Sequence, residues 1–168
     1  AMTISNGEGN GQIVPGFGFM PNNMLGETDV NPHGAAGWPR GVRLSSMMAP
    51  SLAADGGGAW FALGSGGSNR IRSVIFLMLQ RLLVRGAPLA AAVAAPRLHV
   101  EEGHLDFEPG FDEAEAARLT ALFADHRAWP EKSLFFGGCH AVARGADGTP
   151  VAAGDARRAG HGEVIAGA

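Results

Sequence analysis

The longest apolar stretch of the chain predicts a helix near its middle. Residues 71–84, IRSVIFLMLQRLLV, are apolar on almost every face, and Gly86 and Pro88 follow closely. Glycine and proline in these positions are typical of the end of a helix. We therefore expect a buried helix over this range, followed by a second short helix over residues 88–95.

A capping motif predicts another helix further along the chain. Asp112 is followed three residues later by Glu115, which is the spacing of a capping box. The apolar residues that follow lie three or four positions apart or adjacent, on one face of a helix: Leu119, Leu122 and Phe123. We expect this helix to reach about Ala128.

Short apolar or alternating segments beside glycine turns predict the strands. Residues 51–53 and 59–63 flank the turn ADGGG, and residues 97–109 alternate apolar and polar positions around Gly103. A last hairpin is expected to turn at Asp147–Gly148. Because strands and helices come in blocks, the pattern favours an α+β fold over alternating βαβ units.

The N-terminal quarter is rich in glycine and proline. We expect a strand over residues 1–5, then a glycine-rich turn and a short strand before Asn22. Residues 26–44 contain two prolines and four glycines and predict a long surface excursion. A loop of that length is usually functional or mobile.

Composition and charge narrow the class of function. The 168 residues are 46% hydrophobic and 17% charged, which is typical of one globular domain, and the formal net charge is −3. Without a basic run the chain lacks the surface that nucleic acid or an anionic membrane requires. The uninterrupted apolar run 74–79 is far shorter than the ~20 residues of a transmembrane helix, and the first residues do not resemble a signal peptide. Small-molecule chemistry is therefore favoured.

The loop LGSGGSNRI, residues 63–71, is the main candidate for a chemical site. It lacks the lysine of a phosphate-binding loop and the three-glycine spacing of a dinucleotide site. Its small residues precede a helix, where their N–H groups can point into one space and stabilise an anion or a developing oxyanion. The alternative is a tight turn without a chemical role.

Other polar residues each allow two interpretations. Ser45 and Ser46 can bind a carboxylate or be ordinary loop serines, and Glu27 can hold an ammonium group or simply be solvated. Cys139, beside His140, is expected to be a small buried thiol, because adjacent strand residues face opposite sides.

A run of histidine and glutamate residues raises the question of a metal. It comprises His99, Glu101, Glu102 and His104. Strand alternation divides these residues between two faces, so we expect no metal site there.

Five segments together resemble the small-subunit region of the γ-glutamyltranspeptidase family. In chain order they are IVPGFGFMPNNMLGE, RLSSMMAPSL, LGSGGSNRI, APRLHVE and GADGTPVAAGDARR. The resemblance spans nearly all of residues 1–168, which we take as a single domain. It implies part of an N-terminal-nucleophile hydrolase, an αββα sandwich cut from a precursor into large and small subunits, without a cofactor.

The resemblance also implies roles for individual residues. Ser45 and Ser46 match the pair that binds the glutamyl α-carboxylate, and Glu27 matches an acid for the α-ammonium group. Asn6, with Ser5 as a possible partner in the role, lies near a substrate-binding asparagine. For the oxyanion hole, alignment on Arg70–Ile71 selects Gly67 and Ser68, whereas alignment on the paired glycines selects Gly66 and Gly67. Met24 replaces a residue that is often polar in the family.

The family's catalytic threonine has no counterpart in residues 1–168. Thr3 cannot replace it, because two residues precede it and the mechanism needs a free α-amino group on the nucleophile. We therefore expect this chain to lack the start of the small subunit and the whole large subunit, its expected partner. The expected function is γ-glutamyl transfer or hydrolysis by the complete protein. The alternatives are a non-catalytic ligand-binding or assembly protein and an acylase on the same fold. The resemblance favours a periplasmic or secreted compartment.

Overall fold

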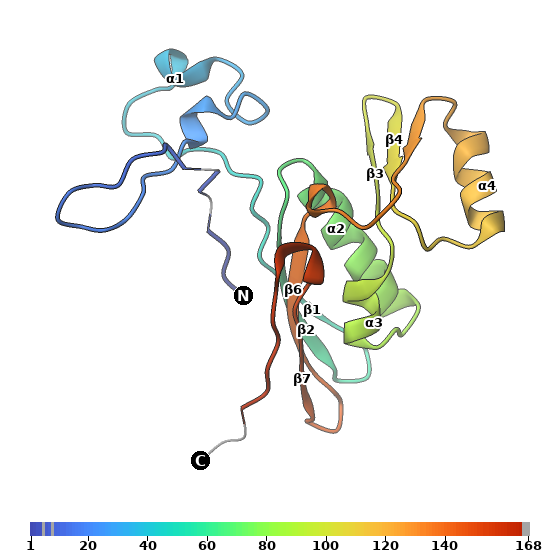
Figure 1. The fold of residues 1–168 in the computed structure, drawn as a ribbon. Coiled ribbons are helices and arrows are strands. Elements are labelled where there is room, and N and C mark those ends of the chain that lie inside the picture. Colours follow the sequence, from blue (N-terminus) through green and yellow to red (C-terminus); the bar gives the residue numbers. More distant parts are fainter. Residues whose placement is uncertain (5, 8, 166–168) are drawn as a thin grey trace.

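The computed structural model describes residues 1–4, 6–7 and 9–165, and a four-stranded antiparallel sheet lies at its centre (Figure 1). The strands in spatial order are β1 (Ser51–Ala54), β2 (Trp60–Gly66), β6 (Gly138–Arg144) and β7 (Pro150–Ala153). Both predicted hairpins, β1–β2 and β6–β7, are confirmed. In the first turn the Asp55 carboxylate accepts hydrogen bonds from the Gly57 and Ala59 amides, both at 2.9 Å.

Two helices cover one face of this sheet (Figure 1). They are α2 (Arg70–Leu79), which continues as a π-helical turn over Gln80–Val84, and α3 (Leu89–Ala94). The predicted helix is present but is buried on one face only, because Phe76 is 68% exposed and Val84 78% exposed. The buried residues of this segment recur every three or four positions and form one stripe against the sheet: Ile71, Val74, Met78 and Leu82.

A smaller sheet lies beside the first. It contains β3 (Leu98–Glu101), β4 (His104–Phe107) and β5 (His126–Ala128), with β3 and β4 antiparallel around Gly103, as predicted. Strand β5 is parallel to β4 and follows α4 (Glu113–Leu122), so one crossover of the kind that the block pattern disfavoured is present. The predicted cap of α4 is confirmed, because the Asp112 carboxylate accepts from the Glu115 amide at 2.7 Å.

The extension of this helix to Ala128 is wrong. The helix ends at Leu122 because the next residue, Phe123, is extended, and residues 126–128 pair with β4 instead. The Leu105 amide donates to the Asp125 carbonyl at 3.1 Å, which brings this segment to the sheet edge. Pairing with β4 therefore outweighs the helical pattern of the sequence at residues 126–128.

The expected N-terminal strands are absent from the described part of residues 1–23. Several glycines there have positive φ angles, among them Gly7, Gly16 and Gly18, and these interrupt extended backbone. The excursion over residues 26–44 is mostly loop, as predicted, with a 3-10 turn at Met24–Gly26 just before it and a short helix α1 (Gly34–Gly37) within it.

The face of the large sheet opposite α2 and α3 is partly open. Leu52 and Trp60 are exposed there, and Val142 of β6 lies on the same face. No helix in the described part of the chain is long and apolar enough to cross a bilayer. The architecture is thus a sheet with one helical layer and an open apolar face.

Candidate active site

A tight turn that starts at Gly66, the last residue of β2, leads into α2. Strand β2 ends at Gly66, which pairs with Gly138 of β6, and both Gly67 (φ 126°) and Ser68 (φ 53°) then have positive φ angles. The Gly67 carbonyl accepts from the Arg70 amide at 3.1 Å, and the Ser68 carbonyl accepts from the Ile71 amide at 3.0 Å. The sharp reversal therefore uses these carbonyl groups to start the helix.

The N–H groups of the same two residues are available to a ligand. Among the described residues, neither the Gly67 nor the Ser68 amide has a hydrogen-bond acceptor. Adjacent N–H groups in a turn that leads into a helix favour an anionic oxygen. The geometry can thus perform the oxyanion chemistry predicted for this loop, and the assignment of particular amides stays a prediction.

A second glycine holds this turn in place. A Cβ atom on Gly67 would lie 2.8 Å from the Cα atom of Gly137, and a Cβ atom on Gly137 would overlap with the Gly66 carbonyl oxygen. Gly137 follows the 3-10 turn Leu134–Phe136 and also has a positive φ angle, 76°. The two backbones therefore approach too closely for a side chain on either residue.

A cavity of about 180 Å³ opens beside the turn. Glu27 lines it from the N-terminal excursion, together with Gly66, Gly67 and Ser68. Four of the residues predicted from the sequence, which come from two distant segments of the chain, thus border one cavity.

Three other predicted residues, Ser45, Ser46 and Asn6, do not line this cavity but are followed in the chain by residues that do. Ser45 and Ser46 are exposed and immediately precede Met47 and Met48, which do line it, and the Ser46 hydroxyl accepts from the Met48 amide at 3.1 Å. The Asn6 carbonyl accepts from the Gly9 amide at 3.1 Å. Ser5 lies outside the described residues.

Sequence reasoning noted Met24 as a departure from the family but missed the other side chains of the cavity wall. Three methionines contribute to it, Met24, Met47 and Met48, together with the basic residues Arg70 and Arg158. Met47 and Met48 directly follow Ser45 and Ser46, so their place beside a predicted binding residue could have identified them. Their apolar side chains gave no such indication.

The two arginines brace the turn that carries Gly137. The Arg70 guanidinium donates to the Phe135 carbonyl at 3.0 Å and lies 4.5 Å from the centre of its ring. Arg158 donates to the Leu134 carbonyl at 3.3 Å.

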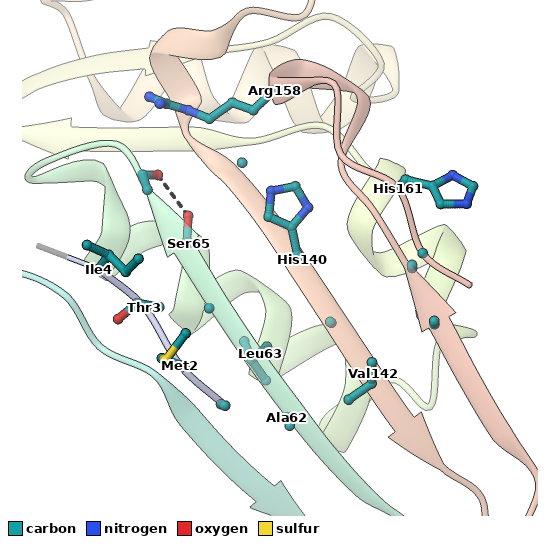
Figure 2. A pocket seen from close by; sticks show the side chains of 18 of the residues that line it. Met2, Thr3, Ile4, Ala62, Leu63, Ser65, His140, Val142, Arg158 and His161 are labelled. Atoms are coloured by element: carbon teal, nitrogen blue, oxygen red, sulfur yellow. Dashed lines mark hydrogen bonds between the residues drawn. The ribbon is translucent and has the colours of Figure 1, made fainter. Parts of the chain in front are cut away.

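A larger cavity, about 560 Å³, lies on the open face of the sheet and shares Gly66, Met48 and Arg158 with the first (Figure 2). Figure 2 shows Thr3 on a segment that runs beside β2, and His140 rising from β6. The Thr3 hydroxyl is buried there without a hydrogen-bond partner among the described residues.

Behind the turn lies a cluster of four buried charged side chains. Arg97 pairs with Asp155, and Arg157 pairs with both Glu108, at 2.5 Å, and Asp155, at 3.2 Å. Arg97 also donates to the carbonyl groups of Phe136 and Gly137, each at 3.1 Å. The cluster is therefore bonded directly to the glycine that supports the candidate oxyanion turn.

Burial and ion pairing have opposite effects on the pKa of Asp155. Burial raises the pKa of this carboxyl, but the Arg97 charge and the amide donors of Cys139 and Arg157 outweigh that effect, and the pKa lies below 3.8. The carboxylate is therefore ionised at neutral pH.

The other candidate side chains have structural roles. Burial raises the pKa of the Cys139 thiol to about 11, so it is not a nucleophile at neutral pH. His99 contacts Ser73 and Glu101, and His104 contacts Asp125. Among the described residues, no group of three or more histidine, cysteine or acidic side chains could hold a metal ion.

Comparison with known proteins gives a consistent family. The γ-glutamyltranspeptidase family model matches residues 1–165. The chain is 34% identical to the acylase ACY 1 proenzyme of Pseudomonas sp. strain SE83 over 136 residues, which are 81% of this chain and 24% of that protein. It is 32% identical to the glutathione hydrolase proenzyme of Pseudomonas aeruginosa over 101 residues, 54% of this chain and 18% of that protein. The chain thus spans about a quarter or less of the length of these relatives.

Solved structures agree with this fold. The γ-glutamyltranspeptidase of Pseudomonas nitroreducens, complexed with L-DON, superposes with a TM-score of 0.78 at 24% identity, covering 99% of this chain and 92% of that one. The transpeptidase CapD of Bacillus anthracis superposes with a TM-score of 0.73 at 25% identity, covering 98% and 90%. The predicted fold class, part of an N-terminal-nucleophile hydrolase, is confirmed. Together with the family match over residues 1–165, these comparisons establish that the chain belongs to the γ-glutamyltranspeptidase family.

Proposed function

We propose that the complete protein containing this chain transfers or hydrolyses γ-glutamyl groups through an acyl-enzyme. The observation that carries the proposal is the cavity bordered by both Glu27 and the turn Gly66–Ser68. An acid at this place can bind the α-ammonium group of a glutamyl donor. Free N–H groups at the turn can bind the oxygen of its reacting carbonyl.

The chemical step needs a nucleophile from outside residues 1–168. An N-terminal threonine hydroxyl attacks the γ-carbonyl carbon while its own α-amino group takes the hydroxyl proton. The carbonyl electrons move to oxygen, and the amides of Gly67 and Ser68, or of Gly66 and Gly67, donate to that oxyanion. Collapse expels the amine with the proton and leaves an ester. Water or an amino acceptor then attacks the ester carbonyl, the bond from that carbon to the threonine oxygen breaks, and the acceptor's proton returns to the threonine as the product leaves.

The open face of the large sheet supports a large-subunit partner. Leu52 is 74% exposed, and Trp60 and Val142 are also exposed on that face. A second sheet packed there would bury these side chains and complete an αββα sandwich. The partner proposed is the large subunit of the same precursor.

An acylase is a second candidate, for two reasons. Two relatives at 34% and 33% identity are named acylase proenzymes. Met24, Met47 and Met48 also give the cavity an apolar wall, which suits an acyl chain that is less polar than glutamate. Comparing turnover of γ-glutamyl-p-nitroanilide with that of glutaryl-p-nitroanilide, which lacks the ammonium group, separates the two functions.

A polypeptide of residues 1–168 alone is expected to be inactive. Its N-terminal residue is alanine, so it presents no free threonine amine. The complete precursor is expected to cleave itself and to release p-nitroaniline from γ-glutamyl-p-nitroanilide, measured by absorbance. Turnover by the isolated polypeptide would contradict the proposed nucleophile. Ligand binding without turnover by the complete protein would favour the non-catalytic alternative.

Replacing Ser45 and Ser46 together with alanine in the complete protein tests the carboxylate site. Each hydroxyl bonded to a charged carboxylate contributes ~1.5–3 kcal/mol, so KM for γ-glutamyl-p-nitroanilide is expected to rise at least tenfold. The matched control is Ser51→Ala, because the Ser51 hydroxyl donates locally to the Ala49 carbonyl at 2.9 Å. An unchanged KM in the double variant means that these serines do not bind the carboxylate.

A further inference from the structure

Asn69, the residue directly after the candidate oxyanion turn, connects two acidic side chains from different parts of the chain. Its side-chain amide nitrogen donates to the Asp29 carboxylate at 3.0 Å and to the Glu101 carboxylate at 2.6 Å. An asparagine NH₂ group has two hydrogens, so each carboxylate can receive one. Hydrogen bonds to ionised acceptors are stronger than those between neutral groups.

Asp29 belongs to the turn that carries Glu27. The Glu27 carbonyl accepts from the Val30 amide at 3.2 Å and from the Asn31 amide at 2.9 Å. Asn31 is fully buried, and its side chain donates to the Met24 carbonyl. Residues 24–31 therefore form one hydrogen-bonded turn, and an interaction that holds Asp29 also restricts the position of Glu27.

Glu101 is the fixed end of the connection. It lies at the end of β3, where His99 contacts it at 3.3 Å and Arg72 of α2 at 3.4 Å. His99 is buried, and its other ring nitrogen lies 2.8 Å from the Ser73 hydroxyl of α2. Strand β3 and helix α2 thus hold the Glu101 carboxylate in place.

We propose that Asn69 is a positioning residue that fixes the Glu27 turn relative to the amides of Gly67 and Ser68. Asn69 is the neutral donor between two carboxylates that would otherwise repel each other. Asn69 also directly follows Ser68 in the chain. Its side-chain bond to Asp29 and the candidate oxyanion donors therefore belong to the same short segment. The inference rests on the proposed function and deepens it, because it identifies what selects acyl donors that bear an α-ammonium group.

The expected consequence is selective. In the complete protein, Asn69→Ala frees the Glu27 turn, so KM for γ-glutamyl-p-nitroanilide is expected to rise about tenfold with a smaller change in kcat. Glutaryl-p-nitroanilide has no ammonium group for Glu27 to bind, and its kcat/KM is expected to change less than about threefold. Asn69→Asp is expected to raise KM further, because it places a third carboxylate between Asp29 and Glu101.

Hydrogen–deuterium exchange provides a readout that does not need activity. Faster exchange of the amides of residues 24–31 is expected in Asn69→Ala and Asn69→Asp, relative to the unsubstituted complete protein. The matched control is Asn10→Ala, because Asn10 is exposed and its side chain accepts locally from the Gln12 amide at 2.9 Å.

Two results would overturn the positioning role. One is unchanged exchange over residues 24–31 in both Asn69 variants, and the other is an equal loss of kcat/KM on the two substrates. Failure of the proposed function is distinguishable, because the unsubstituted protein would then not turn over γ-glutamyl-p-nitroanilide, whereas the exchange comparison would still show whether Asn69 holds residues 24–31.

Discussion

Gly67→Ala in the complete protein is expected to lower kcat for γ-glutamyl-p-nitroanilide by about 10²–10³-fold, the cost of losing one oxyanion donor. Gly67 has a φ angle of 126°, which L-residues with side chains rarely adopt, and its new Cβ atom would lie 2.8 Å from Gly137. Either the turn or residues 134–137 must move, and the N–H groups move with them.

The control for backbone strain is Gly86→Ala. Gly86 has a φ angle of 61°, and no atom lies within 4 Å of the position of a new Cβ. An alanine there therefore has a strained backbone but no clash, and the position is outside the candidate site. Its kcat is expected to stay unchanged. If Gly67→Ala does not fold, replacing the backbone amide of residue 68 by an ester removes one candidate N–H donor without forcing φ away from 53° and tests the same assignment. A folded variant lacking that N–H but with unchanged kcat would exclude Ser68 as a donor.

Gly66→Ala tests whether the effect of a new side chain in the turn is specific to Gly67. Gly66 has no positive φ angle, and the nearest group to a new Cβ is the flexible end of Arg158, at 3.7 Å. This substitution is therefore expected to preserve the fold. Because the Gly66 N–H group is retained, kcat is expected to change much less than in Gly67→Ala, and an equal loss in both variants would mean that any side chain added to the turn lowers kcat.

Local chemistry made part of the fold predictable. The hairpins at Asp55 and Asp147 and the cap at Asp112 depend on residues within a few positions of one another, and all three were predicted. Strand β5 was not, because residues 126–128 continue a helical pattern and become a strand only through pairing with β4. The buried face of α2 could not be predicted for a similar reason. The helix is apolar on several faces, and only its packing against the sheet determines which face is buried.

The candidate site shows the same division. Glu27 and residues 66–68 were identified from motifs, whereas Gly137 was not, because its role is a close approach to Gly67 across 70 residues of sequence. The burial of Arg97 and Asp155 could not be predicted either, because charged residues are usually exposed and the sequence does not show which ones are buried. Contacts between distant segments therefore account for the missed residues.

Those buried charges lead to the largest expected change in stability. Asp155→Asn keeps the size of the side chain but leaves Arg97 and Arg157 with only Glu108 to balance them. Breaking a buried ion pair in this way is expected to lower the free energy of unfolding by about 3–5 kcal/mol at pH 7. Denaturant unfolding of the complete protein measures it, with Glu131→Gln, an exposed carboxylate, as the matched control.

The pH dependence identifies the carboxylate as the cause. Because the folded-state pKa of Asp155 lies below its ordinary value of 3.8, its contribution to stability is present above that pH and is lost as the pH falls toward the folded-state pKa. The difference between the unsubstituted protein and Asp155→Asn is therefore expected to be constant from pH 7 to about 5 and to shrink below 3.8. A difference that persists unchanged at low pH would mean that packing or hydrogen bonding, and not the charge of Asp155, holds Arg97 and hence Gly137 in place.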